Sequence, residues 1–132
     1  MSWLLDTNAI IALRRQPHSP IWERVRQQSP AAIQVSAVVL YELYFGVFKS
    51  ERVDRNLARL ESLGFGILPF DRDDAREAAV IRAHLARLGT PIGPYDLLIA
   101  GQARARNLTL VTHNTAEFAR VPDLKMADWE VP

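Results

Sequence analysis

The sequence contains no cysteine, which excludes disulfide bonds, iron–sulfur clusters, thiolate zinc sites and cysteine nucleophiles. The absence also suits a reducing cytoplasm. No apolar run approaches the roughly 18 residues that a membrane-spanning helix needs, and the first residues lack the basic segment of a signal peptide. We therefore expect a cytoplasmic protein that does not bind a membrane.

An excess of either charge is also missing, because 16 basic residues balance 15 acidic ones and leave a net charge of +1. This charge is too small to indicate a nucleic-acid-binding protein by itself. The basic residues are almost all arginine, since Lys49 and Lys125 are the two lysines. Arginine suits bidentate recognition of phosphate, although GC-rich coding produces the same bias. With 132 residues, 48% of them apolar, the chain has the size and composition of a single domain over residues 1–132.

Short apolar segments alternate with segments of helical periodicity along most of the chain. This alternation is typical of an α/β fold with a parallel sheet. We predict a three-layer α/β/α arrangement, with helices on both faces of a central, mainly parallel sheet of four to five strands. The expected strands are residues 3–5, 32–35, 66–69, 108–111 and an edge strand within 124–129. The expected helices are one that starts near residue 9 and ends at Pro17, and those near 20–29, 37–48, 53–63, 72–88, 95–106 and 116–118.

The predicted helix 37–48 follows Ser36, a good N-cap residue, and is apolar over most of its circumference. It should therefore be largely buried. Glu42 lies among its apolar side chains, and burial of an ionised carboxylate is unfavourable unless it is paired or bound to a metal ion. The alternative is a glutamate that reaches the surface or pairs with an arginine.

Further acids and amides stand where predicted strands end or helices begin. Asp6 follows the first strand, and Asp96 lies in the first turn of its helix; each also fits as an ordinary helix-capping or helix-start residue. Asn114 and Glu117 follow the fourth strand, where a turn residue and a surface acid are the alternatives. Since the carboxyl ends of parallel strands meet at one edge of a sheet, we expect these groups to converge there with Glu42.

Carboxylates gathered at one edge would repel one another without a cation. A set of oxygen ligands without histidine or cysteine favours Mg²⁺ or Mn²⁺ over zinc. Such ions serve phosphoryl-transfer chemistry. The sequence therefore predicts a Mg²⁺ or Mn²⁺ site formed by Asp6, Glu42 and Asp96, with Asn114 and Glu117 as further candidate catalytic residues.

The histidines and tryptophans give a weaker signal. We expect His18 and His84 at the surface, whereas His113 adjoins the predicted site and is a candidate for substrate contact. The three tryptophans fit packing positions better than base-stacking platforms. They are Trp3, Trp22 and Trp129.

Four segments together resemble the signature blocks of PIN-domain ribonucleases, and in particular the VapC-type toxins of bacterial toxin–antitoxin pairs. The resemblance runs from residue 3 to about residue 129, in the order and spacing of the family, and the ordered set is more specific than any one block. The segments are Leu5-Asp6-Thr7-Asn8, Ser36-Ala37-Val38-Val39-Leu40-Tyr41-Glu42-Leu43 with Gly46, Thr90-Pro91-Ile92-Gly93-Pro94-Tyr95-Asp96, and Val111-Thr112-His113-Asn114-Thr115-Ala116-Glu117-Phe118.

This resemblance implies a PIN-like fold and Mg²⁺- or Mn²⁺-dependent endonucleolytic cleavage of RNA. It matches Asp6, Glu42 and Asp96 to the three core metal-binding acids, and Asn114 to a position where many members have a fourth acid. An asparagine there leaves occupancy by one metal ion or two open. In many relatives the residue before this asparagine is also asparagine, whereas this sequence has His113 there. The resemblance further assigns Glu117 as an acid of the toxin branch and Thr112 as a supporting hydroxyl, and Thr7 and Asn8 stand with Asp6 in the first block.

The resemblance also implies a homodimer and a cognate small antitoxin that covers the acidic groove, often with a basic residue facing the carboxylates. Several arginines are candidates to line a phosphate path for RNA beside the site, and His113 is a further candidate RNA contact. These arginines are Arg14, Arg15, Arg52, Arg55 and Arg59.

Two other functions fit parts of the pattern. A phosphoacceptor signalling domain also has an aspartate at a strand end, but it needs a lysine near the phosphate, and neither Lys49 nor Lys125 directly follows an inner strand. A catalytically silent PIN-like interaction module would bind only an antitoxin or a second copy. The presence of all three core acids argues against that second alternative.

Overall fold

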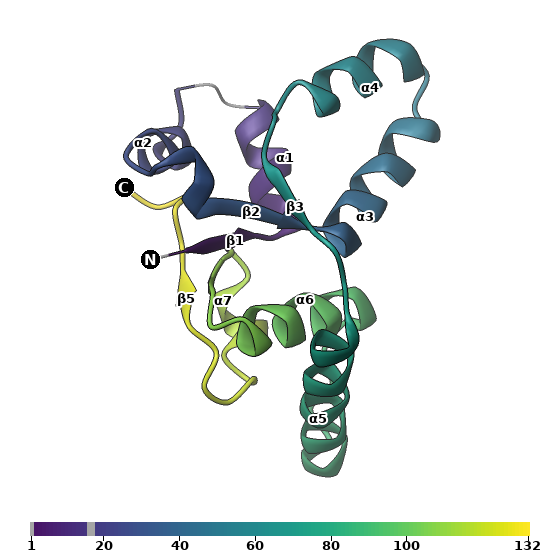
Figure 1. Ribbon diagram of the computed structural model, residues 1–132, viewed down its shortest axis with the longest axis vertical. Helices are drawn as coiled ribbons and strands as arrows, with labels where there is room; N and C mark the ends of the chain where they lie inside the picture. The colour runs from purple at the N-terminus through teal and green to yellow at the C-terminus, as the bar shows by residue number, and fades with distance from the viewer. Residues whose placement is uncertain (1, 16–17) are drawn as a thin grey trace.

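The computed structural model describes residues 2–15 and 18–132, and its centre is one sheet of five parallel strands (Figure 1). The strand order is β3-β2-β1-β4-β5, so β1 lies in the middle and pairs with β2 and β4. The predicted mainly parallel sheet is thus confirmed, and every strand pair is parallel. The strands are β1 (Trp3–Leu5), β2 (Ile33–Ser36), β3 (Gly66–Leu68), β4 (Thr109–Val111) and β5 (Met126–Ala127).

Helices cover both faces of the sheet, which confirms the three layers (Figure 1). On one side lie α1 (Thr7–Arg15), α2 (Pro20–Arg26), α3 (Ala37–Phe48) and α4 (Val53–Glu61), and on the other α5 (Arg72–Leu88), α6 (Pro94–Ala105) and the short α7 (Thr115–Phe118). A 3₁₀ turn, η1 (Pro30–Ala32), leads into β2. The predicted end of the first helix at Pro17 lies outside the described residues. No helix in the described part of the chain is long and apolar enough to cross a membrane.

Local sequence signals fix several helix ends. The Ser36 hydroxyl accepts a hydrogen bond from the Val38 amide (3.1 Å) and caps α3. Asp71 and Asp74 form a reciprocal capping box at the start of α5. Gly89 ends the same helix in the left-handed region, with φ of 70°. The predicted edge strand 124–129 is shorter than expected, since pairing with β4 is confined to two residues.

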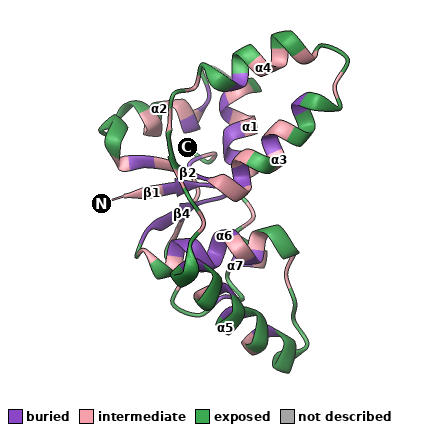
Figure 2. Cartoon of the chain, turned by 45° about the vertical axis from the view of Figure 1, so that its right-hand side comes forward, coloured by how far each residue is buried: buried purple, intermediate pink, exposed green. Residues whose placement is uncertain are grey.

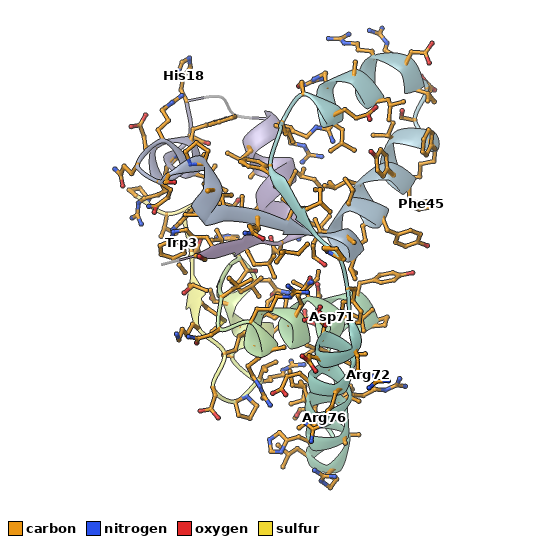
Figure 3. The ribbon with its side chains drawn as sticks, in the orientation of Figure 1. Trp3, His18, Phe45, Asp71, Arg72 and Arg76 are labelled. Atoms are coloured by element: carbon orange, nitrogen blue, oxygen red, sulfur yellow. The ribbon has the colours of Figure 1, made fainter. Side chains whose placement is uncertain are left out.

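The prediction that α3 is largely buried is wrong. Val39, Leu43 and Val47 form a buried stripe at four-residue spacing, but the aromatic side chains of Tyr41 and Phe45 are 57% and 60% exposed. The reason is that α3 and α4 extend beyond the sheet as a pair, so α3 has neighbours on part of its circumference (Figures 1 and 2). Figure 3 shows Phe45 projecting away from the rest of the chain.

The tryptophans take packing positions, as expected. Trp3 lies against Trp129 with ring centroids 4.9 Å apart, and the Trp22 indole N–H donates to the Leu13 carbonyl (2.8 Å). His18 is exposed, as predicted, whereas His84 is half-buried in α5.

Gly101 allows α5 and α6 to pack closely, because a Cβ at this position would lie 2.6 Å from Ala78 Cα. We expect Gly101→Ala to lower the free energy of unfolding by about 1–3 kcal/mol, since the two backbones would have to separate. Gly46→Ala is the matched control, because Gly46 is also helical and its added Cβ would meet no atom within 4 Å. That change should raise stability by about 0.4–1 kcal/mol. Equal urea midpoints for the two variants would contradict the close-packing argument.

Candidate active site

Asp6 follows β1 at the carboxyl edge of the sheet. Its amide donates to the Val111 carbonyl (3.1 Å), which continues the pairing of β1 with β4, and its carboxylate accepts from the Ala9 amide (2.8 Å). The side chain is only 4% exposed. Burial raises the pKa of Asp6, while the hydrogen bonds from Thr112 and Ala9 act in the opposite direction. Asp6 therefore caps α1 and at the same time holds a second oxygen at the sheet edge.

Glu42 reaches the same edge from α3. It is half-buried, and its Oε1 accepts a hydrogen bond from the Thr7 hydroxyl (2.9 Å). Thr7 is the first residue of α1 and follows Asp6 directly. Thr7 therefore orients the Glu42 carboxylate, which is a supporting role of the kind predicted for it.

Asp96 lies in the first turn of α6, after the N-cap residue Gly93. Burial, and then the charges of Glu117, Asp6 and Glu42, raise the pKa of Asp96 to about 6. A carboxylate responds in this way when other carboxylates lie close to it. Four acids from four separate segments thus act on one another electrostatically.

Glu117 and Asn114 form a bridge between β4 and α6. The Gly93 amide donates to Glu117 Oε1 (2.9 Å), and the Asn114 side-chain amide donates to Oε2 (2.7 Å). These two hydrogen bonds lower the pKa of Glu117. Thr112 is buried, with 1% of its surface exposed, and its hydroxyl accepts a hydrogen bond from the backbone amide of Asn114 (3.0 Å). Glu117 therefore stays ionised and fixed beside Asp96.

Two acids at this edge were missed in the sequence. They are Asp128 and Glu130, and His113 Nδ1 lies 2.9 Å from Asp128 Oδ2. Among residues 2–15 and 18–132, His113, Asp128 and Glu130 form the one group of three potential metal ligands whose ligand atoms all lie within 4.8 Å of one another. The Asp128 hydrogen bond and charge raise the pKa of His113. Glu130 also helps to raise the pKa of Asp6. The available signal was their position, directly after the fifth strand at the same edge of the sheet.

The three predicted metal ligands are more widely spaced than that group, because Asp6, Glu42 and Asp96 do not bring their oxygens within 4.8 Å of one another in the described structure. Their chemistry nevertheless fits a hard dication. Mg²⁺ keeps several waters and is held in proteins by one or two carboxylates, so direct ligation by all three is not required. The mutual repulsion that raises the pKa of Asp96 is what such a cation would relieve.

The remaining candidates lie around this edge. Arg14 and Arg15 line a cavity of about 420 Å³ together with Thr7 and Glu42. Arg52 precedes α4 and does not line that cavity. Asn8 is exposed and shares a second hollow with His113 and Asn114.

Comparison with known proteins identifies the family of the chain. Residues 3–124 match the PIN domain family. The chain is 40% identical over 131 residues to "tRNA(fMet)-specific endonuclease VapC" of Shigella flexneri, with 98% of each chain covered. It is 35% identical over 133 residues to "Ribonuclease VapC2" of Rickettsia felis, covering 98% of this chain and 99% of that protein.

Solved structures give the same result. The VapBC complex of Salmonella typhimurium bound to DNA contains a chain that matches with a TM-score of 0.93 and 39% identity over 98% of both chains. VapBC-1 of nontypeable Haemophilus influenzae matches with a TM-score of 0.89 and 34% identity, again over 98% of both chains. Since sequence and fold agree over nearly the full length, the chain belongs to the PIN domain family, where it is a VapC-type toxin endoribonuclease.

Proposed function

We propose that this endoribonuclease cuts RNA with a divalent cation, Mg²⁺ or Mn²⁺, held by Asp6, Glu42 and Asp96. The observation that carries the proposal is the arrangement of the acids, with Asp6 at the carboxyl end of β1, Glu42 hydrogen-bonded to the neighbouring Thr7 and Asp96 in the first turn of α6. Burial, and then the charges of Glu117, Asp6 and Glu42, raise the pKa of Asp96 to about 6, in agreement with this arrangement. Acids crowded in this way at the edge of a parallel sheet are suited to a dication with oxygen ligands.

Each residue of the site has a distinct task in this proposal. A cation held by these carboxylates would supply polarisation of the scissile phosphate and activation of an attacking water. Asp6 is held in one orientation by the Ala9 amide, and Thr7 orients Glu42. Glu117, fixed by Asn114 and the backbone of the α6 start, keeps a permanent negative charge beside Asp96. Asn114 and Glu117 thus act as catalytic residues next to the three ligands.

The names of two relatives support a substrate class for this chain. Two relatives of about 40% identity are named tRNA(fMet)-specific endonucleases, and we propose a tRNA as the substrate of this chain. Arg14, Arg15 and Arg52 would contact its phosphates, and His113 on the exposed rim would contact the nucleotides at the cut. Phosphate contacts of this kind position the RNA without reading its sequence.

The partners in this proposal are an antitoxin and a second copy of the chain. Solved relatives are VapBC complexes, and one is described as a member of the VapBC family of toxin–antitoxin systems. A small cognate antitoxin would cover the acidic edge, with one of its basic residues facing the carboxylates. Both proteins would act in the cytoplasm. The homodimer expected from the family has an apolar surface available in the exposed rings of Tyr41, Phe45 and Tyr95.

Removal of the metal tests the proposal. In Mg²⁺ or Mn²⁺ the purified protein should cut initiator tRNA at a defined site, and EDTA should stop the reaction. Metal bound only to the folded state should raise the free energy of unfolding by about 2.7 kcal/mol when its concentration is one hundred times Kd. Cleavage and melting temperature that are both indifferent to EDTA would reject the metal site. Metal binding without cleavage of any RNA would favour the silent interaction module.

A further inference from the structure

One cavity beside the candidate metal site combines acidic and basic groups. It has a volume of about 420 Å³ and lies among α1, α3 and α4. Thr7 and Glu42, which belong to the acidic edge, form part of its lining. Arg14, Arg15 and Arg59 belong to the same lining. A ligand in this cavity would therefore lie next to the reaction site.

These three arginines lie around one cavity without forming ion pairs among the described residues. Arg14 Nε is buried and has no hydrogen-bond partner in the described part of the chain. Arg59 Nη2 donates to a backbone oxygen, the Arg14 carbonyl, at 3.4 Å, and none of the ion pairs among the described residues includes Arg14, Arg15 or Arg59.

The unpaired charges of these arginines and the unpartnered Arg14 Nε are both unfavourable in the free protein. Burial, and then the charges of Arg59 and Arg15, lower the pKa of Arg14. A buried donor without a partner costs about 1–3 kcal/mol. An anion in the cavity would relieve the repulsion among these three charged side chains.

Phosphate is the anion that fits these groups. The planar guanidinium presents its donors in a fork that matches phosphate oxygens, and arginine pairs are frequent at such sites. Because Thr7 and Glu42 belong to both the acidic edge and the cavity, an RNA strand bound at the acids can place a neighbouring phosphate in the cavity. The carboxylate of an antitoxin segment has similar chemistry, and its binding to these arginines is the competing outcome of the test.

We infer that the cavity around Arg14 and Arg59 is a phosphate subsite that holds the RNA backbone beside the cleaved bond. The inference rests on the proposed ribonuclease function and deepens it, because such a subsite fixes which phosphodiester bond lies over the acids. Arg14 and Arg59 are then substrate-positioning residues of the site.

The test measures RNA binding without cleavage. A short fluorescein-labelled RNA is titrated in EDTA with the wild type, Arg14→Gln, Arg59→Gln and the control Arg87→Gln, and fluorescence anisotropy is followed over a range of salt concentrations. Arg87 is exposed in the last turn of α5, on the other side of the sheet, and does not line the cavity. We expect Kd to rise about tenfold in each cavity variant, and the salt slope to fall by about 0.7 for each lost phosphate contact. Arg87→Gln should change neither.

Cleavage kinetics separate this inference from the function itself. Loss of a contact made equally before and during the reaction raises KM and leaves kcat nearly unchanged, and Arg59→Lys should restore most of the salt slope. Wild-type affinity and salt slope in both glutamine variants would overturn the subsite, as would weakened binding of an antitoxin with unaltered RNA binding. Wild-type protein that binds RNA through these arginines but never cleaves it would reject the ribonuclease proposal and leave the subsite standing. Unchanged or higher melting temperatures in the variants exclude misfolding as the cause.

Discussion

Asp96→Asn should reduce the cleavage rate about a thousandfold and leave the protein folded. The change removes one oxygen charge from the proposed metal site, where electrostatic stabilisation of the reacting phosphate is worth several kcal/mol, and about 4 kcal/mol corresponds to three powers of ten. Asp6→Asn should have a similar effect, although its carboxylate also caps α1. Rates are measured under single-turnover conditions at saturating Mg²⁺.

The pH dependence of Asp96 provides an independent readout. Its pKa in the folded protein is about 6, above the value of 3.8 that applies without its surroundings. Between these values the folded state binds more protons than the unfolded state, so the stability of the metal-free wild type should fall as pH rises from about 4 to about 6. At limiting Mg²⁺, cleavage should decline below about pH 6, because protons and the cation compete for the same carboxylate. Saturating Mg²⁺ should move this decline to lower pH, because the cation relieves the repulsion that raises the pKa of Asp96. Metal-free Asp96→Asn should show a smaller fall in stability, since the raised pKa of Asp6 still contributes to it.

Asp73→Asn is the matched control, since Asp73 is an exposed acid in the first turn of α5. It should retain wild-type cleavage. Undiminished cleavage by Asp96→Asn would remove Asp96 from the site. Loss of activity accompanied by a large drop in melting temperature would point to a structural role instead, because relief of carboxylate repulsion should stabilise the metal-free variant.

The sequence predicted the fold well where local signals and overall packing agree. The helix 37–48 begins and ends where expected because Ser36 caps it, and Asp71 marks the start of α5 in the same way. The burial of α3 was not predictable, since it depends on how far a helix extends beyond its sheet. An apolar pattern shows which side chains are available for packing and does not show whether neighbours exist.

The site was predictable to the same extent. Asp6, Asp96 and Glu117 could be placed at one edge because parallel strands share a carboxyl end. Asp128 and Glu130 were missed because the strand was predicted within residues 124–129, which left Asp128 inside it, whereas β5 ends at Ala127. The grouping of Arg14 with Arg59 depends on the packing of α4 against α1 and α3, which no local signal encodes.

Arg106→Ala should lower the free energy of unfolding by about 3 kcal/mol, the largest loss expected from any single surface-reaching side chain here. Asp74 is fully buried, 0% exposed, and Arg106 donates to both of its carboxylate oxygens (3.2 and 3.0 Å). Burial by itself raises the pKa of Asp74, but the hydrogen bonds from Arg106 and from the Asp71 backbone outweigh it, and the pKa lies below its usual value. Removing one partner of a buried pair strands the other charge, which typically costs about 3–5 kcal/mol.

The lower end of that range applies because the Arg106 side chain is itself 29% exposed, so water can partly replace it. For a chain of this length the melting temperature should fall by roughly 10 °C. Arg76→Ala, an exposed arginine on α5 that Figure 3 shows projecting from the helix, should change stability by less than about 0.5 kcal/mol. A folded-state pKa below the unfolded value adds stability above the unfolded pKa and loses it as pH falls, so the variant should also lose part of the wild type's destabilisation by acid. Similar melting temperatures for the Arg106 and Arg76 variants would show that Asp74 does not depend on Arg106, and that the α5–α6 layer holds its buried acid by the capping box and Gln102 alone.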